Sequence, residues 1–115
     1  MSGKNLLIIG RDNGSTELCE MIMINNGYTV TSTDGKRYFV GRLQGRSMED
    51  EFDYAMDVYG DRSELLQKVN AEIKISIVNG YEKAIFYNKD MSEPTTTILF
   101  EPRGKMTNLL EEMAK

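Results

Sequence analysis

The sequence predicts an α/β fold in which strands and helices alternate and the first strands run parallel. Residues 6–9 are four large apolar residues in a row, too few to cross a membrane and typical of a buried strand. Residues 5–33 then have a strand, helix and strand pattern, and a crossover of roughly 20 residues suits a βαβ unit with parallel strands. Near the other end, residues 106–113 have the apolar spacing of an amphipathic helix.

The first predicted helix begins at Ser15 or Thr16, because either hydroxyl can cap a helix. Its expected buried face consists of Leu18, Met21 and Ile22. The helix is expected to end at residues 26–27, Asn-Gly, since glycine readily adopts the left-handed conformation that stops a helix. Residues 28–33 are β-branched and aromatic and predict the second strand.

The Asp34-Gly35 pair leaves two alternatives open. An Asp-Gly pair between two β-rich segments favours a hairpin. The same pair also suits a loop into a helix over residues 36–43, although two glycines and bulky aromatic residues weaken that helix.

The middle of the chain predicts a linker, a strand and a helix. Residues 47–53 are acidic and read as a linker, and residues 54–58 form a short, mostly apolar strand. Asp61, followed three residues later by Glu64, makes a capping box for the next helix. The expected buried face of that helix is Leu65, Leu66 and Val69.

The last third contains the observations that fit a parallel sheet least well. Residues 73–77 alternate between apolar and polar, whereas a central parallel strand is more often apolar throughout. Asn79-Gly80 suits either a hairpin turn or the start of a helix over residues 81–91. Residues 95–100 predict a strand, and Pro102 interrupts the chain after it. If both Gly-containing pairs are hairpin turns, the fold is a small α+β domain with antiparallel hairpins.

Composition limits the classes of function. The 115 residues suit one domain, and a net charge of −4 argues against a nucleic-acid partner except through an attached domain. Cys19 is the only cysteine, which predicts a reducing, cytoplasmic environment. The chain has no histidine, the commonest general base, and no run of the roughly 20 apolar residues that span a bilayer.

Three segments resemble the receiver domains of response regulators. Residues 6–35, LLIIGRDNGSTELCEMIMINNGYTVTSTDG, are similar to the family's first strand, first helix and Gly-Tyr-x-Val second strand. Residues 97–115, TILFEPRGKMTNLLEEMAK, are similar to its last strand, the proline that follows and the final helix. Residues 52–58, FDYAMDV, resemble the strand that ends in the phosphate-accepting aspartate.

The resemblance implies one receiver-like domain over residues 1–115, with a doubly wound, five-stranded parallel sheet of flavodoxin-like topology. It also implies that Asp57 is the phosphoacceptor. The remaining positions of the family's site are altered. They are Gly10 and Arg11 in place of the two metal-binding acids, with Asp12 beside them, Asn79 in place of the hydroxyl residue, Glu101 in place of the lysine, and the retained Pro102.

These replacements remove most of the positive charge that phosphoryl transfer to a carboxylate needs. The resemblance therefore predicts an atypical receiver: a non-enzymatic protein-interaction and dimerisation module that works without phosphorylation. We expect Arg11 to pair with Asp57 or Glu101 in place of a metal ion. No cofactor is expected, and Asp12 and Asp57 are the candidate ligands if magnesium binds at all.

The expected partners are a second copy of the chain, a histidine kinase or an output domain. The expected contact face contains Tyr87, Met91, Ile98 and Lys105. Two alternative functions remain open. One is a working receiver that a histidine kinase phosphorylates on Asp57. The other is a small α+β domain that binds RNA or protein, because residues 30–43 are similar to the first motif of the Sm-type barrel.

Overall fold

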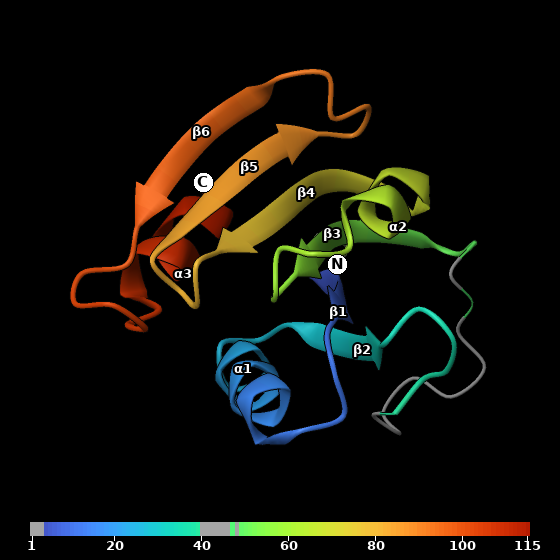
Figure 1. Ribbon diagram of the computed structural model, residues 1–115, viewed down its shortest axis with the longest axis horizontal. Helices are drawn as coiled ribbons and strands as arrows, with labels where there is room; N and C mark the ends of the chain where they lie inside the picture. Colours follow the sequence, from blue (N-terminus) through green and yellow to red (C-terminus); the bar gives the residue numbers. More distant parts are fainter. Residues whose placement is uncertain (1–3, 40–46, 48) are drawn as a thin grey trace.

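The computed structural model describes residues 4–39, 47 and 49–115. Six strands form one mixed sheet in the order β2-β1-β3-β4-β5-β6 (Figure 1). The strands are β1 (Asn5–Ile9), β2 (Thr29–Thr33), β3 (Glu51–Asp57), β4 (Asn70–Val78), β5 (Lys83–Asn88) and β6 (Pro94–Leu99). The helices are α1 (Gly14–Asn25), α2 (Ser63–Lys68) and α3 (Thr107–Met113).

The predicted doubly wound, five-stranded parallel sheet is wrong. β2, β1, β3 and β4 do run parallel to one another, so the predicted βαβ unit of the first 33 residues is present. However, β5 pairs antiparallel with both β4 and β6. Two hairpins thus complete the sheet, and the described part of the chain has only three short helices. The alternative prediction of an α+β domain with antiparallel hairpins describes this half of the molecule.

The turn at Asn79-Gly80 explains why the sheet changes direction. Asn79, Gly80 and Tyr81 all have left-handed backbone angles, with φ of 54°, 63° and 66°. Asparagine and glycine adopt this region at low cost, and such turns match the twist of an antiparallel hairpin. The chain therefore reverses into β5, and the helix predicted over residues 81–91 does not form.

At Asp34-Gly35 the outcome lies between the two alternatives. Gly35 has φ of 94°, and the chain turns back far enough for Tyr38 to form a single antiparallel bridge with Thr33. No further ladder follows within the described residues up to Phe39. The remainder of the helix predicted over residues 36–43 lies outside the described residues.

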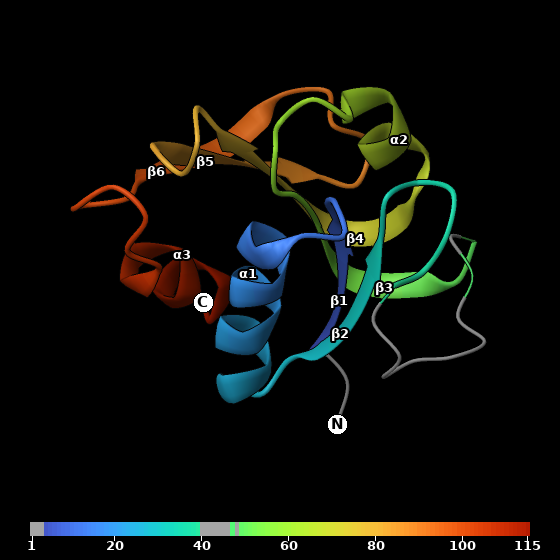
Figure 2. The ribbon, with the colours of Figure 1, turned by 60° about the horizontal axis from the view of Figure 1, so that its bottom comes forward.

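The helices cover the two faces of the sheet unequally. α1 and α3 lie on one face and α2 on the other (Figure 2). The larger core cluster joins β1, β3, β4 and β5 to α1 and α3, and includes Met23, Met56, Ile75 and Leu109. The smaller cluster lies under α2 and includes Ile9, Phe52 and Leu66. No helix in the described part of the chain is both long and apolar enough to cross a membrane.

Helix α1 buries a different face from the one its apolar residues predict. Leu18 and Met21 are each 60% exposed. Ile22, the third residue of the predicted face, is half-buried against the larger core cluster. The buried residues are Thr16, Cys19, Glu20 and Met23. The helix also begins earlier than predicted, because the Asn13 side chain accepts a hydrogen bond from the backbone N–H of Thr16 at 3.1 Å and caps it. An apolar strip of α1 is therefore left in contact with solvent.

The other helices keep their predicted positions with one change of cap. α2 begins after Arg62, and no side chain caps it, so the predicted Asp61–Glu64 capping box is absent. Its Leu66 is buried as predicted. In α3 the expected apolar face is confirmed, since Leu109 and Met113 are both buried.

Candidate functional site

The structure places the carboxyl-terminal ends of β1, β2 and β3 side by side, along the edge of the sheet at which the parallel strands end. Ile9, the last residue of β1, lies next to Asp57, the last residue of β3. On the other side, the Gly10 N–H donates to the Thr33 carbonyl at 2.9 Å. Arg11 and Asp57 therefore lie at the same edge, as the resemblance implied. We name the loops that follow β1, β2 and β3, residues 10–13, 34–37 and 58–62, the carboxyl-edge loops.

Gly10 has no room for a side chain. A Cβ atom at this position would lie 2.8 Å from the Thr16 hydroxyl and 3.0 Å from a methyl of Val58. The next residue holds the same arrangement, since the Arg11 N–H donates to the Thr16 hydroxyl at 3.1 Å. An acid, as in the resembled family, would displace Thr16, so this tip of the sheet is packed rather than open.

Asp57 is fully buried and closes the loop between β3 and α2. One carboxylate oxygen accepts the N–H of Gly60 at 3.0 Å and the other accepts the N–H of Arg62 at 2.9 Å. Burial raises the pKa of Asp57 above its ordinary value, and these backbone hydrogen bonds oppose the increase. The carboxylate thus acts as a backbone cap in this arrangement.

Arg11 pairs with an acid, but with a different one from those predicted. Its guanidinium lies 2.5 Å from a carboxylate oxygen of Asp61, and both side chains are about half exposed. The guanidinium also lies over the Tyr59 ring, 4.1 Å from its centre. The Asp61 hydrogen bond raises the pKa of Arg11. Arg11 is therefore held across the loop that follows β3 and not against Asp57 or Glu101.

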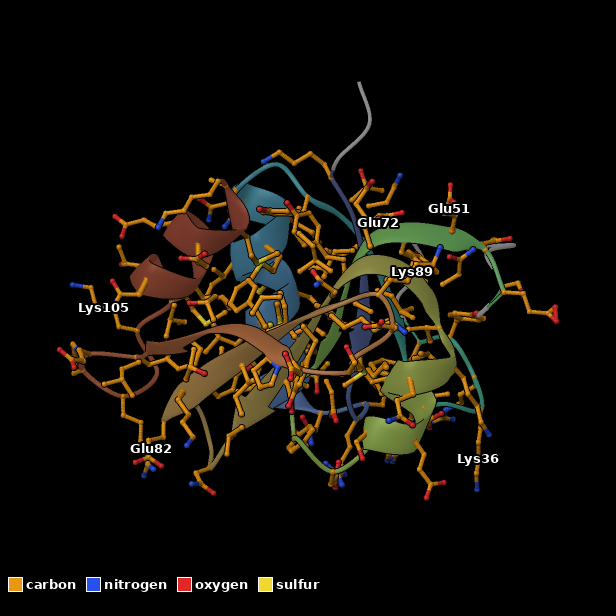
Figure 3. All side chains as sticks on the ribbon, turned by 90° about the horizontal axis from the view of Figure 1, so that it is seen from above. Lys36, Glu51, Glu72, Glu82, Lys89 and Lys105 are labelled. Carbon is orange, nitrogen blue, oxygen red and sulfur yellow. The ribbon has the colours of Figure 1, made fainter. Side chains whose placement is uncertain are left out.

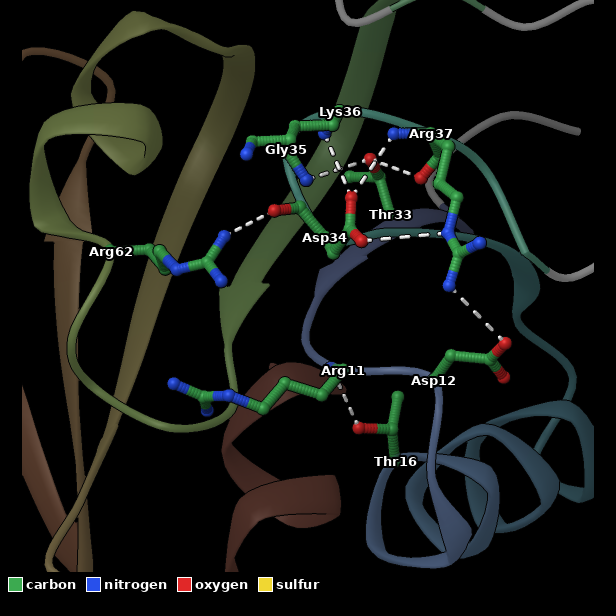
Figure 4. Close-up of polar contacts among 9 residues, drawn as sticks. All are labelled: Arg11, Asp12, Thr16, Thr33, Asp34, Gly35, Lys36, Arg37 and Arg62. Atoms are coloured by element: carbon green, nitrogen blue, oxygen red, sulfur yellow. Dashed lines mark hydrogen bonds and ion pairs between the residues drawn. The ribbon is translucent and has the colours of Figure 1, made fainter.

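The loop that follows β2 carries a small network of charges (Figure 4). The Asp34 carboxylate accepts the N–H groups of Lys36 at 2.9 Å and Arg37 at 3.1 Å, and these bonds lower its pKa. The Arg37 guanidinium reaches Asp34 at 3.6 Å and Asp12 at 3.7 Å. From the opposite side, Arg62 donates to the Asp34 carbonyl. The network ties the three carboxyl-edge loops together.

Asn79, Glu101 and Pro102 do not join this group. The Asn79 amide donates to Glu82 at 2.9 Å within the hairpin turn, and Glu82 also faces Arg103 at 3.6 Å. Glu101 and Pro102 follow β6, and β4 and β5 separate β6 from β3. With strands about 4.8 Å apart, β6 lies roughly 14 Å from β3. The receiver-like pocket implied by the resemblance is therefore not assembled from these residues.

The two candidate metal ligands, Asp12 and Asp57, interact with different groups. Asp12 is exposed and faces Arg37, whereas both oxygens of Asp57 accept backbone N–H groups. Within the described ranges, no group of three histidine, cysteine, aspartate or glutamate residues could hold a metal ion. The polar side chains of the carboxyl-edge loops therefore form hydrogen bonds and ion pairs within and between these loops.

A second candidate site, which the sequence analysis did not identify, is the outer edge of β6. This strand, PTTTIL, has no charged residue, and its Leu99 side chain is 51% exposed. At the opposite edge of the sheet, the bridge from Tyr38 to Thr33 and the N–H of Phe39, which donates to the Ser32 carbonyl at 3.2 Å, cover part of β2. The signal in the sequence is the run of uncharged, β-branched residues after Pro94.

The predicted contact face is only partly present next to this edge. Lys105 is exposed, whereas Tyr87 and Ile98 are half-buried. Met91 is half-buried and packs against the smaller core cluster. Ile98, by contrast, packs against the larger core cluster, so Met91 and Ile98 lie on opposite faces of the sheet.

Comparisons of the chain with protein-family models, with curated proteins and with solved structures find no match.

Proposed function

We propose that this chain is a small α+β protein-interaction domain that joins a second copy of itself along the free edge of β6. The observation that carries the proposal is the uncharged strand at the end of the sheet, whose outer side pairs with no strand in the described part of the chain. Such an edge is a template for another strand, and folded proteins usually protect it with charges, bulges or a covering segment. The β5–β6 ladder has an irregularity between Phe86 and Tyr87, and residues 96–99 of β6 follow it in regular register.

The direction of the backbone groups supports the proposal. The Phe100 N–H donates to the Glu82 carbonyl at 3.0 Å, which sets the alternation of the antiparallel ladder. The N–H and C=O groups of Ile98 therefore point to β5, and those of Thr97 and Leu99 point outward. The Leu99 carbonyl accepts the Asn108 side chain at 2.9 Å, consistent with its outward direction. Thr97 offers one outward donor and one outward acceptor.

A second copy fits this edge because two β6 strands can pair antiparallel around a two-fold axis. A pairing that sets Thr97 of one copy against Leu99 of the other gives the outward N–H groups of both residues an acceptor in each copy. The Leu99 carbonyl, which already accepts the Asn108 amide, would use its second lone pair for this bond. No charged side chain of one β6 strand would then lie opposite a like charge of the other. Since β2, at the other edge, is partly covered, the pairing closes at a dimer instead of continuing into a fibre.

This function keeps the non-enzymatic character that the resemblance to receivers implied. The burial of Asp57 and its two backbone hydrogen bonds support an interaction that does not depend on phosphorylation, because neither oxygen is presented to a phosphate donor. The binding surface lies on β6 and does not require the altered positions of the family's site.

The test is the molar mass in solution, measured by light scattering after size-exclusion chromatography over a dilution series. The native chain is expected to have twice the mass of one chain at high concentration. Thr97→Pro should give monomers, because it removes an outward N–H that the fold itself does not use. Thr97→Val keeps the N–H and should remain dimeric. Thr97→Lys is a second edge variant that should also be monomeric.

A native chain that stays monomeric at every concentration would overturn the proposal. A dimer that survives both Thr97→Pro and Thr97→Lys, each confirmed to be folded by circular dichroism, would overturn it equally, since its interface would lie elsewhere.

A further inference from the structure

We propose that the loop after β2, the end of the loop after β3 and helix α2 form a binding site for a phosphate-bearing small molecule. A cavity of about 410 Å³ lies between residues 34–36, which follow β2, and residues 61–65 with Lys68, most of which belong to α2. We name it the β2–α2 cavity. Its volume lies within the range of small-molecule sites, which run from roughly 300 to 1,000 Å³. The proposal is independent of dimer formation through β6.

The cavity lies beside a position at which α/β sheets bind ligands. The crossover from β1 leads to β2 on one side, and the crossover from β3 leads to β4 on the other. Successive connections therefore leave in opposite directions between β1 and β3. The cavity lies beside this point, because its lining residues follow β2 and β3, the neighbours of β1 on either side. The parallel half of this sheet has such a point although the antiparallel half does not contribute to it.

The charges around the cavity favour an anion once their internal partners are counted. Two of its three acids are paired with cations that do not line the cavity: Asp34 with Arg37 at 3.6 Å, and Asp61 with Arg11 at 2.5 Å. Lys36 and Lys68 also line the cavity, and neither forms an ion pair with a residue in the described part of the chain. Glu64 is the remaining acid.

Arg62 is placed to contact a ligand directly. Its guanidinium crosses from the loop before α2 and donates to the Asp34 carbonyl on the opposite side of the cavity (Figure 4). This bond uses one of the five N–H donors of the guanidinium and leaves the planar group held in position. An arginine fixed in this way can bind two phosphate oxygens at once, with Lys36 and Lys68 as additional point charges.

Gly35 sets the shape of the cavity between these cations. It has φ of 94°, and a Cβ atom there would lie 2.8 Å from a methyl of Leu65. The positive φ favours glycine at this turn, and a Cβ atom here would require the Leu65 side chain to move. The polar hydroxyl of Ser63 lies on the α2 side, where it can donate to a phosphate oxygen.

The test is an NMR titration of the native chain with inorganic phosphate, compared with sodium chloride at the same ionic strength. Saturable shifts of the Gly35, Lys36 and Ser63 amides are expected with phosphate only. Adenosine monophosphate should shift the same amides. Tighter binding of this ester would assign the rest of the cavity to the organic part of the ligand, and equal binding would assign the phosphate group alone.

Variants distinguish binding of phosphate in the β2–α2 cavity from its general attraction to positive charge on the protein. Arg62→Gln should weaken phosphate binding by roughly tenfold, because a charge-assisted, bidentate contact is lost. Lys36→Gln, on an exposed side chain, provides the same test if Arg62→Gln fails to fold. The matched control is Lys105→Gln, since Lys105 lies on the opposite side of the molecule from Lys36 (Figure 3).

Two results would overturn the proposal: shifts that sodium chloride reproduces, or phosphate affinity that is equal in the native chain, Arg62→Gln and Lys36→Gln. The dimer mass under "Proposed function" does not depend on either variant, so the two proposals can fail separately.

Discussion

At the scale of single residues, Asp57 shows how a side chain can attract a functional interpretation while serving the backbone. It ends a mostly apolar strand, as a phosphoacceptor would, but its oxygens accept the N–H groups of Gly60 and Arg62. The loop requires glycine at position 60, because Gly60 has φ of 70° and a Cβ atom there would lie 2.5 Å from the Ile77 carbonyl. The sequence therefore encodes a tight turn closed by a carboxylate.

Asp57→Asn is expected to lower the free energy of unfolding by about 1.5–3 kcal/mol, because an amide can accept one of the two backbone N–H groups and repels the other. Chemical denaturation measures this loss. Asp61→Asn is the control, since the exposed pair with Arg11 should contribute less than about 1 kcal/mol. Equal effects of the two variants would contradict the capping role.

The loss should also depend on pH. Burial raises the pKa of Asp57 in the folded state, so the folded chain binds the proton more tightly than the unfolded chain, whose aspartates titrate near about 3.9. The contribution of Asp57 to stability therefore decreases as the pH rises from that value through the raised pKa. The difference between the native chain and Asp57→Asn should be larger below this range than above it.

At the scale of elements, α1 shows that the spacing of apolar residues does not by itself decide which face of a helix is buried. Its apolar residues predict one buried face, but the helix packs with Cys19 and Met23 toward the sheet and leaves Leu18 and Met21 exposed. The rotation follows from the cap at Asn13 and the close approach of Thr16 to Gly10, which fix how the helix leaves β1. Contacts at one end of the helix thus decide which side faces the core.

Met23→Ala is expected to destabilise the fold by about 2–5 kcal/mol, because it leaves a cavity in the core. Leu18→Ala removes a similar number of atoms from a side chain that is 60% exposed, so its effect should be within about 0.5 kcal/mol. Thermal or denaturant unfolding of both variants measures the comparison. A larger loss for Leu18→Ala would show that α1 packs with the face that its apolar pattern predicts.

At the scale of the whole molecule, the sheet is parallel in its first four strands and antiparallel in its last two. The parallel part brings Gly10, Arg11 and Asp57 to one edge, and the antiparallel part moves Glu101 and Pro102 away from them. It also produces the free edge of β6. Both proposed sites therefore depend on where the chain changes from crossovers to hairpins.

The strand directions have a direct test in NMR. In an antiparallel pair, the Hα atoms of residues in a non-hydrogen-bonded pair lie close together, which does not occur in a parallel pair. We expect a strong Hα–Hα contact between Ile85 and Thr97, which face each other in β5 and β6. No such contact is expected between Ile9 and Asp57. The absence of the first would contradict the hairpin and with it the β6 edge.

At Asn79-Gly80 the sequence predicted either a hairpin turn or the start of a helix, and the tertiary structure has the hairpin. The site was less predictable than the turn. Arg11 lies beside several carboxylates, so an ion pair with one of them was predictable. Its partner is Asp61 because the turn at Gly60 brings this residue close to Arg11.

The sequence alone determined the βαβ unit of the first 33 residues and the buried face of α3. These features follow from periodicity, caps and strand ends, which are local properties of the chain. Only the tertiary structure decided the exposed face of α1, the partner of Arg11 and the free edge of β6. Each of these depends on how separate segments pack, because burial and charge pairing are set by distances that no local pattern contains.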